Sequence, residues 1–271
     1  IRDSAYFERA TQVAPERPEP KLGLGQALSA QQDPIGARRA FEQARDLSPD
    51  PTRAAELMTR IPELDPRARA QAHLLAAERT RADLDLSAAM THWKNAVALD
   101  ASVAPIAHER AGRLQLELGE HAAALESFRG ATSAAGPTPE RKRGEARALI
   151  GLRDVAGAES AYRAALEIDR SDPRTLRELG ALYGETRRYG EARELLEQAV
   201  SLAPEDPTAR RALAHVLHEQ GELEAAIPHL LAADEQGGAT ADGLRELAAI
   251  QRELDRSGEA EASLERAIGL D

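Results

Sequence analysis

A period of 34 residues is the feature that most constrains the fold of this chain. Alanine recurs at that spacing in one register, at Ala124, Ala158, Ala192, Ala226 and Ala260. A second alanine register lies seven residues further along, and a third register of Gly or Ala begins at Gly112. Three interleaved registers do not arise from an alanine-rich composition alone. A fixed period of this length is typical of repeat architectures, so the chain is expected to form an array of stacked units.

Each unit is predicted to contain two helices. In the unit that begins at Pro173, Leu176, Leu179 and Tyr183 recur at helical spacing, and a second apolar stripe runs from Ala192 to Val200 before Pro204. Helices of about three turns are unstable alone in water, so packing between them must supply the stability. The composition supports an all-α fold, because only 3% of the residues are aromatic while 42% are hydrophobic.

The unit resembles the tetratricopeptide repeat. With Pro173 as position 1, the small residue expected at position 8 is Gly180, and the alanines expected at positions 20 and 27 are Ala192 and Ala199. Position 24 holds five of the chain's aromatic residues: Phe7, Phe41, Trp93, Phe128 and Tyr162. The indole of Trp93 could serve as a ligand platform, but this register favours a place in the core. The resemblance implies a right-handed α-solenoid, a superhelix of helix-turn-helix repeats.

The repeats predict one array over residues 1–271, interrupted once. Residues 52–69 exceed the period and read as one unpaired amphipathic helix with a linker, which would bend the array. Residues 1–17 match only the second helix of a repeat. The complete or nearly complete repeats are expected at 18–51, 70–103, 105–138, 139–172, 173–206, 207–240 and 241–271. The incomplete ends lead us to expect part of a longer polypeptide, and the preference for Arg over Lys favours a bacterial source.

Charge and cysteine content restrict the partners. The net charge of −11 disfavours general binding to nucleic acid or to an anionic membrane surface. No apolar stretch is long enough for direct membrane insertion of this segment. The absence of cysteine excludes disulfides and is compatible with either the bacterial cytoplasm or the periplasm.

The free face of each first helix, at positions 2, 5, 9, 12 and 13, would line the concave groove that the resemblance implies. Arg and His recur on this face, which gives the candidate partner-binding residues Arg113, Arg143, Arg147, Arg177, Arg211, His215, His218 and Arg245. A row of arginines can hold carboxylates, so an acidic segment or a chain's C-terminus is one expected ligand. Alternatively, four glutamates at position 13 neutralise the row: Glu117, Glu185, Glu219 and Glu253.

No metal, cofactor or catalytic site is expected. His215 and His218 are three residues apart on one helix, but a metal site needs further ligands that the sequence does not place beside them. Phosphate-binding loops, metalloprotease motifs and nucleophile motifs are missing from the sequence. The chain is therefore not expected to be an enzyme.

The function expected from these features is a scaffold or adaptor that binds a partner protein or peptide through its groove. Three more specific roles stay open. The first, which rests on architecture alone, is a scaffold of a bacterial polysaccharide export or secretion assembly. The second is the substrate-recruiting arm of an enzyme such as a repeat-containing glycosyltransferase, and the third is the sensor half of a transcription regulator.

Overall fold

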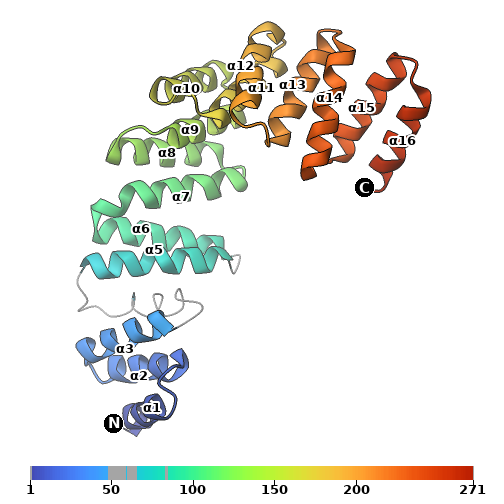
Figure 1. Cartoon of the computed structure of the whole chain (residues 1–271). Coiled ribbons are helices and arrows are strands. Elements are labelled where there is room, and N and C mark those ends of the chain that lie inside the picture. The colour runs from blue at the N-terminus through green and yellow to red at the C-terminus, as the bar shows by residue number, and fades with distance from the viewer. Residues whose placement is uncertain (1, 48–58, 60–65, 83–84, 271) are drawn as a thin grey trace. The chain divides into compact units, whose positions relative to one another are not determined.

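The chain forms two compact units, Ile1–Gly136 and Pro137–Asp271. The computed structural model describes residues 2–47, 59, 66–82 and 85–270 (Figure 1). The inserted helix expected within 52–69, and the bend expected there, lie outside the described residues except for Thr59 and the start of the next helix.

Unit 1 consists of packed helix pairs. Helix α2 packs against α3, α5 against α6, and α7 against α8, while α1 packs against α2. A short 3-10 helix, Ala101–Val103, precedes α7. The helices are α1 (Arg2–Val13), α2 (Pro18–Ala30), α3 (Pro34–Leu47), α5 (Pro66–Ala82), α6 (Leu86–Leu99), α7 (Ala104–Glu117) and α8 (His121–Ala135).

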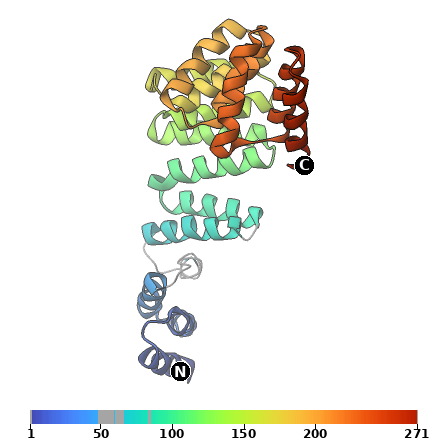
Figure 2. The same ribbon diagram turned by 45° about the vertical axis from the view of Figure 1, so that its right-hand side comes forward.

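Unit 2 repeats one helix pair four times (Figures 1 and 2). Its first helices are α9 (Pro139–Gly151), α11 (Pro173–Glu185), α13 (Pro207–Glu219) and α15 (Ala241–Glu253). The second helices are α10 (Val155–Ile168), α12 (Tyr189–Leu202), α14 (Leu223–Ala233) and α16 (Ser257–Ile268). Each first helix packs against the second helix that follows it. The expected all-α solenoid of helix-turn-helix repeats is confirmed.

Local sequence sets where the first helices of unit 2 begin. Helices α9, α11 and α13 each have Pro in the first turn, where the missing N–H would have had no partner within the helix. The residue before each first helix is Thr or Asp, and its side chain accepts a hydrogen bond from a backbone N–H of the first turn. These caps are Thr138, Asp172, Asp206 and Thr240. The turn after the helix adopts positive φ, at Arg187 (61°) and Gly221 (77°) for example.

Within a pair, a small residue at position 8 faces a large residue at position 24. A Cβ atom added at Gly112 would lie 2.9 Å from the ring of Phe128, and one added at Gly180 would lie 2.7 Å from Cγ of Leu196. Most side chains at position 24 are deeply buried, as Trp93, Tyr162 and Leu196 illustrate, whereas Leu264 of the last repeat is 37% exposed. Gly or Ala therefore recurs every 34 residues because a larger side chain at position 8 would occupy the space that the side chain at position 24 needs.

No helix in the described part of the chain combines the length and the apolar character needed to cross a membrane.

Candidate functional site

Three first helices of unit 2, α11, α13 and α15, form the inner layer of that unit. Helix α11 packs directly against α13, and α13 packs against α15, in addition to the contacts with their own second helices. Consecutive second helices approach each other less closely. A layer whose members lie closer together lies on the inner side of a curved stack.

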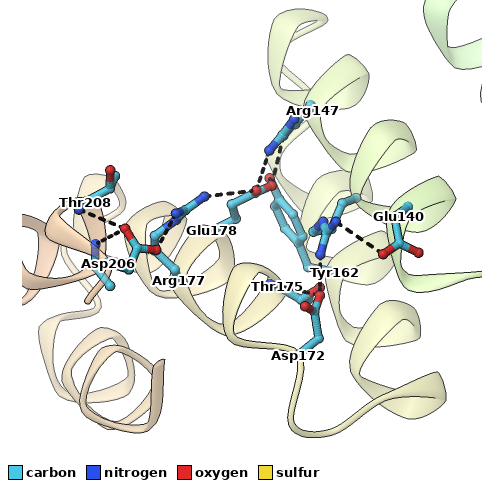
Figure 3. A network of polar contacts seen from close by, with 11 residues as sticks. Glu140, Arg147, Tyr162, Asp172, Thr175, Arg177, Glu178, Asp206 and Thr208 are labelled. Atoms are coloured by element: carbon cyan, nitrogen blue, oxygen red, sulfur yellow. Dashed lines mark hydrogen bonds and ion pairs between the residues drawn. The ribbon is translucent and has the colours of Figure 1, made fainter. Parts of the chain in front are cut away.

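A cavity of about 290 Å³ opens on this inner layer between α9, α11 and α13. It combines an apolar surface, which includes Ile150, Ala181 and Ala212, with charged side chains. Two of the arginines expected from the sequence line it, Arg147 and Arg177. Glu178 and Tyr162 line it as well (Figure 3).

Glu178 is the centre of the polar contacts in this cavity. Its carboxylate accepts hydrogen bonds from both Nε (3.0 Å) and Nη2 (2.5 Å) of Arg147, and from the hydroxyl of Tyr162 (3.2 Å). Nη2 of Arg177 lies 3.5 Å from the same carboxylate. The Glu178 side chain is 11% exposed, whereas that of Arg147 is 52% exposed. Arg147 thus offers a half-exposed positive charge that Glu178 holds in a fixed orientation.

The same contacts shift two pKa values upward. Burial, followed by the nearby charge of Glu178, raises the pKa of the Tyr162 hydroxyl. The hydrogen bond to Glu178 raises the pKa of the Arg147 guanidinium despite partial burial. Tyr162 therefore stays a neutral hydrogen-bond donor and Arg147 stays charged over the physiological pH range.

Two arginines at position 5 bind the cap of the next first helix. Arg143 donates to Asp172, the cap of α11. Arg177 donates to Asp206, the cap of α13, with 2.5 Å between Nη1 and Oδ2 (Figure 3). Each arginine precedes its aspartate by 29 residues. The Arg143 side chain is only 7% exposed and also lies near Glu140. These two arginines therefore link consecutive repeats.

The cap aspartates have lowered pKa values. Burial acts to raise the pKa of Asp172, but hydrogen bonds from Thr175 and the charge of Arg143 outweigh it. For Asp206, burial is likewise outweighed, here by the charge and hydrogen bond of Arg177 together with the backbone N–H groups of Thr208 and Ala209.

Replacing Asp206 by Ala is expected to destabilise unit 2 by about 2 kcal/mol, because the cap of α13 and the partner of Arg177 are lost together. Urea unfolding at pH 7 measures this loss. A carboxyl whose pKa is lower in the folded than in the unfolded chain stabilises the folded state at pH values above its unfolded pKa, which is about 3.9 for Asp. This stabilisation is lost as the pH falls from that value through the folded pKa. The difference between the wild type and Asp206→Ala should therefore shrink below about pH 4.

Asp242 is the matched control for this prediction. Its side chain is 95% exposed and pairs with Arg245 three residues along α15, at 2.9 Å. An exposed pair of this kind contributes little, so Asp242→Ala should change stability by less than about 0.5 kcal/mol. Equal losses in the two variants would show that the contact between repeats contributes nothing.

The other expected site residues are distributed over both units. Arg211 lies on α13 beside a small hollow that includes Thr240, and Arg245 pairs with Asp242 on α15. In unit 1, Arg113 is exposed on α7 and pairs with Glu109 at 2.5 Å. None of these three residues lines the cavity around Glu178.

The two histidines on α13 lie against carboxylates of α15. Nδ1 of His215 lies 3.1 Å from Glu246, and Nε2 of His218 lies 3.3 Å from Glu253. Among the residues that the structure describes, no group of three or more His, Asp or Glu side chains is arranged to hold a metal ion.

Several residues at the site are not predicted by the sequence pattern. The pattern does not mark Glu178, Asp172 or Asp206, and the register of Tyr162 predicts a core position only. One signal is present in the sequence, because in two successive repeats the Arg at position 5 is followed 29 residues later by the Asp before the next first helix, at 143/172 and at 177/206. The contact of Tyr162 with Glu178 has no such signal, since the side chain of Tyr162 is almost fully buried and its hydroxyl donates to Glu178 of the next repeat.

Comparison with protein families gives one match. Residues 185–245 match the model of the tetratricopeptide repeat. This segment begins at the end of α11 and includes α12 to α14 together with the start of α15. No curated protein matches the chain.

Solved structures share the fold at low sequence identity. A tetratricopeptide repeat protein from Parabacteroides merdae is 16% identical, with 93% of each chain covered and a TM-score of 0.61. PilF of Pseudomonas aeruginosa is 18% identical over 72% of this chain and 88% of its own, with a TM-score of 0.63. MamA of Desulfovibrio magneticus RS-1 is 19% identical over 62% of this chain and 94% of its own, with a TM-score of 0.55.

Proposed function

Because this chain belongs to the tetratricopeptide-repeat family, we propose that it is a protein-interaction scaffold that holds a segment of a partner protein on the inner layer of unit 2. The observation that supports this most directly is the cavity of about 290 Å³ between α9, α11 and α13. It offers an apolar surface, which suits a side chain, next to charged groups that can orient a backbone or a carboxylate.

Arg147 is the residue on which binding should depend most. It uses Nε and Nη2 toward Glu178, while a guanidinium has five N–H donors. Its remaining donors, on a half-exposed side chain, suit a carboxylate of the partner, such as an acidic side chain or a C-terminus. Arg143 and Arg177 contribute less in this proposal, since each already holds a cap aspartate.

The histidines and the other arginines would extend the surface along the inner layer. His215 and His218 lie on α13, beyond the two residues of that helix that line the cavity, and Arg245 lies on α15. In this proposal they contact parts of a longer partner segment that continues beyond the cavity. Arg211 of α13 is a proposed contact of the same kind, while Arg113 stays a proposed partner contact within unit 1.

Selection of binding peptides from a random library tests this proposal. The library is displayed once with free C-termini and once with blocked C-termini. Replacing Arg147 by Ala should lower the affinity for the selected peptides by about 10-fold or more, because a hydrogen bond to a charged group contributes about 1.5 to 3 kcal/mol to binding. Replacing the peptide's carboxylate by an amide should give a loss of similar size. Isothermal titration calorimetry provides the affinities.

Arg163 provides the control. It is an arginine of similar exposure (59%), it also pairs with a glutamate, and it lies on the second helix α10. Arg163→Ala should leave peptide affinity within about twofold of the wild type. If Arg147→Ala binds the selected peptides as tightly as Arg163→Ala does, the inner cavity is not their binding site.

A further inference from the structure

The inner cavity of unit 2 contains one charged group that the binding described so far does not use. Glu185 of α11 lines the cavity and is exposed. In the part of the chain that the structure describes, its carboxylate has no hydrogen bond and no ion pair. The carboxylate of Glu178, in the same cavity, is by contrast held by Arg147 and Tyr162. Glu185 is therefore a negative charge that a ligand in the cavity can reach.

Two other glutamates at position 13 pair with the repeat that precedes them. In unit 1, Glu117 lies 2.9 Å from Nη2 of Arg81, and in unit 2, Glu253 lies 3.3 Å from Nε2 of His218. Arg81 and His218 occupy the same place in their repeats, position 12. A basic side chain at position 12 therefore lies within reach of the carboxylate at position 13 of the next repeat.

The repeat before Glu185 provides no such partner. Its position 12 is Ile150, which lines the cavity together with Glu185. Glu219 accepts a hydrogen bond from the hydroxyl of Tyr189, at position 17 of the repeat before it, but position 17 of the repeat before Glu185 is Val155. An apolar residue thus stands at both places from which a partner could come. A basic group from outside the chain can take the place that the residue at position 12 has elsewhere.

Glu185 also lies at the unfavourable end of its helix. It is the last residue of α11, and the last turn of α11 contains no basic residue. The negative end of the helix macrodipole repels a carboxylate, so a glutamate without a partner there lowers the stability of the free chain. A cation bound beside Glu185 would offset this repulsion. The stability of the free chain therefore does not account for a glutamate at this place.

We propose that Glu185 binds a basic side chain, Lys or Arg, of the partner segment whose carboxylate Arg147 holds. This inference rests on the proposed function, because it assigns a second contact in the same cavity. Charge complementarity supports it, since the cavity combines a half-exposed positive charge on α9 with the negative charge at the end of α11 and with apolar surface. The preferred partner therefore carries an acidic and a basic group in one short segment.

Exchange of the two charges tests this contact. Peptides selected with the wild type should contain Lys or Arg in addition to the carboxylate. Glu185→Arg should bind them about 10-fold more weakly, because repulsion replaces the attraction between the charges. Replacing the basic residue of the peptide by Glu should weaken binding to the wild type by a similar factor and should restore binding to Glu185→Arg. Isothermal titration calorimetry provides the affinities.

Glu194 provides the matched control, because it is exposed on α12 of the same repeat. Like Glu185, it has no hydrogen bond or ion pair among the described residues. Glu194→Arg should keep the affinity for both peptides within about twofold of the wild type.

The stability of the free chain separates binding from folding. Arg suits the last turn of a helix better than Glu does, so Glu185→Arg should be at least as stable as the wild type in urea unfolding. Weaker binding at unchanged or higher stability is the expected result. Should Glu185→Arg not fold, Glu185→Gln takes its place, and its affinity should no longer depend on the basic residue of the peptide.

The outcomes distinguish this inference from the proposed function. Selected peptides without a basic residue, or equal affinity of the wild type and Glu185→Arg for them, would overturn the role of Glu185. A loss of binding in Arg147→Ala would then still support the inner cavity as the binding site. If Arg147→Ala also bound as tightly as the wild type, the proposed function and this inference would fail together.

Discussion

Replacing Gly180 by Leu is expected to destabilise unit 2 by about 3 kcal/mol, at the upper end of the range for overpacked cores. A Cβ atom alone would lie 2.7 Å from Cγ of Leu196 and 3.3 Å from the backbone oxygen of Ala192. Leu196 is fully buried, so it cannot move aside without displacing the helix. Urea unfolding followed by circular dichroism measures the loss.

Gly190 is the matched control, because it lies in α12 of the same repeat and a Cβ atom there would meet nothing within 4 Å. Gly190→Ala should raise stability by about 0.5 to 1 kcal/mol, since Ala restricts the unfolded chain and favours the helix. If Gly180→Leu proved as stable as Gly190→Ala, close packing between positions 8 and 24 would not be what holds the two helices of a repeat together.

Acidification from pH 7 to about pH 4 is expected to destabilise unit 1 by up to about 3 kcal/mol through one histidine. His73 of α5 is buried, and its Nδ1 lies 2.8 Å from Nδ1 of His92 on α6. Burial, the second imidazole and Arg69 lower the pKa of His73 to about 4. Because the unfolded chain takes up this proton near pH 6.5 and the folded chain does so only near pH 4, stability falls between these values.

The geometry also predicts a loss of stability on acidification, since the protonated rings of His73 and His92 would direct N–H donors at each other. His73→Leu tests the cause, because His73 occupies position 4, where the repeat 173–206 has the buried Leu176. Urea unfolding at several pH values should show a flatter profile for the variant between pH 6.5 and 4. Parallel profiles of variant and wild type would assign the acid sensitivity to other groups.

Much of the fold could be predicted from the sequence because packing between helices repeats with the chain. A small residue recurs at position 8 and a large one at position 24, as Gly180 and Leu196 do in one repeat. This pairing is therefore visible in the sequence without coordinates. Cap residues such as Asp206 lie directly before a proline, which marks where the helix begins. Interactions that recur with the 34-residue period can therefore be predicted from the sequence.

The site was less predictable because its contacts join side chains from different repeats. The sequence placed Arg143, Arg147 and Arg177 on one face, but a helical pattern does not distinguish an arginine that faces a ligand from one that holds a cap aspartate. The glutamate that orients Arg147 comes from the next first helix, 31 residues away.

Hydrogen exchange of the whole chain, with and without a peptide selected from the library, tests the proposed binding surface most directly. The account predicts slower exchange in the first helices α9, α11 and α13, around Arg147 and Glu178, and no such protection in Arg147→Ala under the same conditions. Protection confined to the second helices of unit 2, or to unit 1, would contradict the proposal that the inner layer of unit 2 holds the partner.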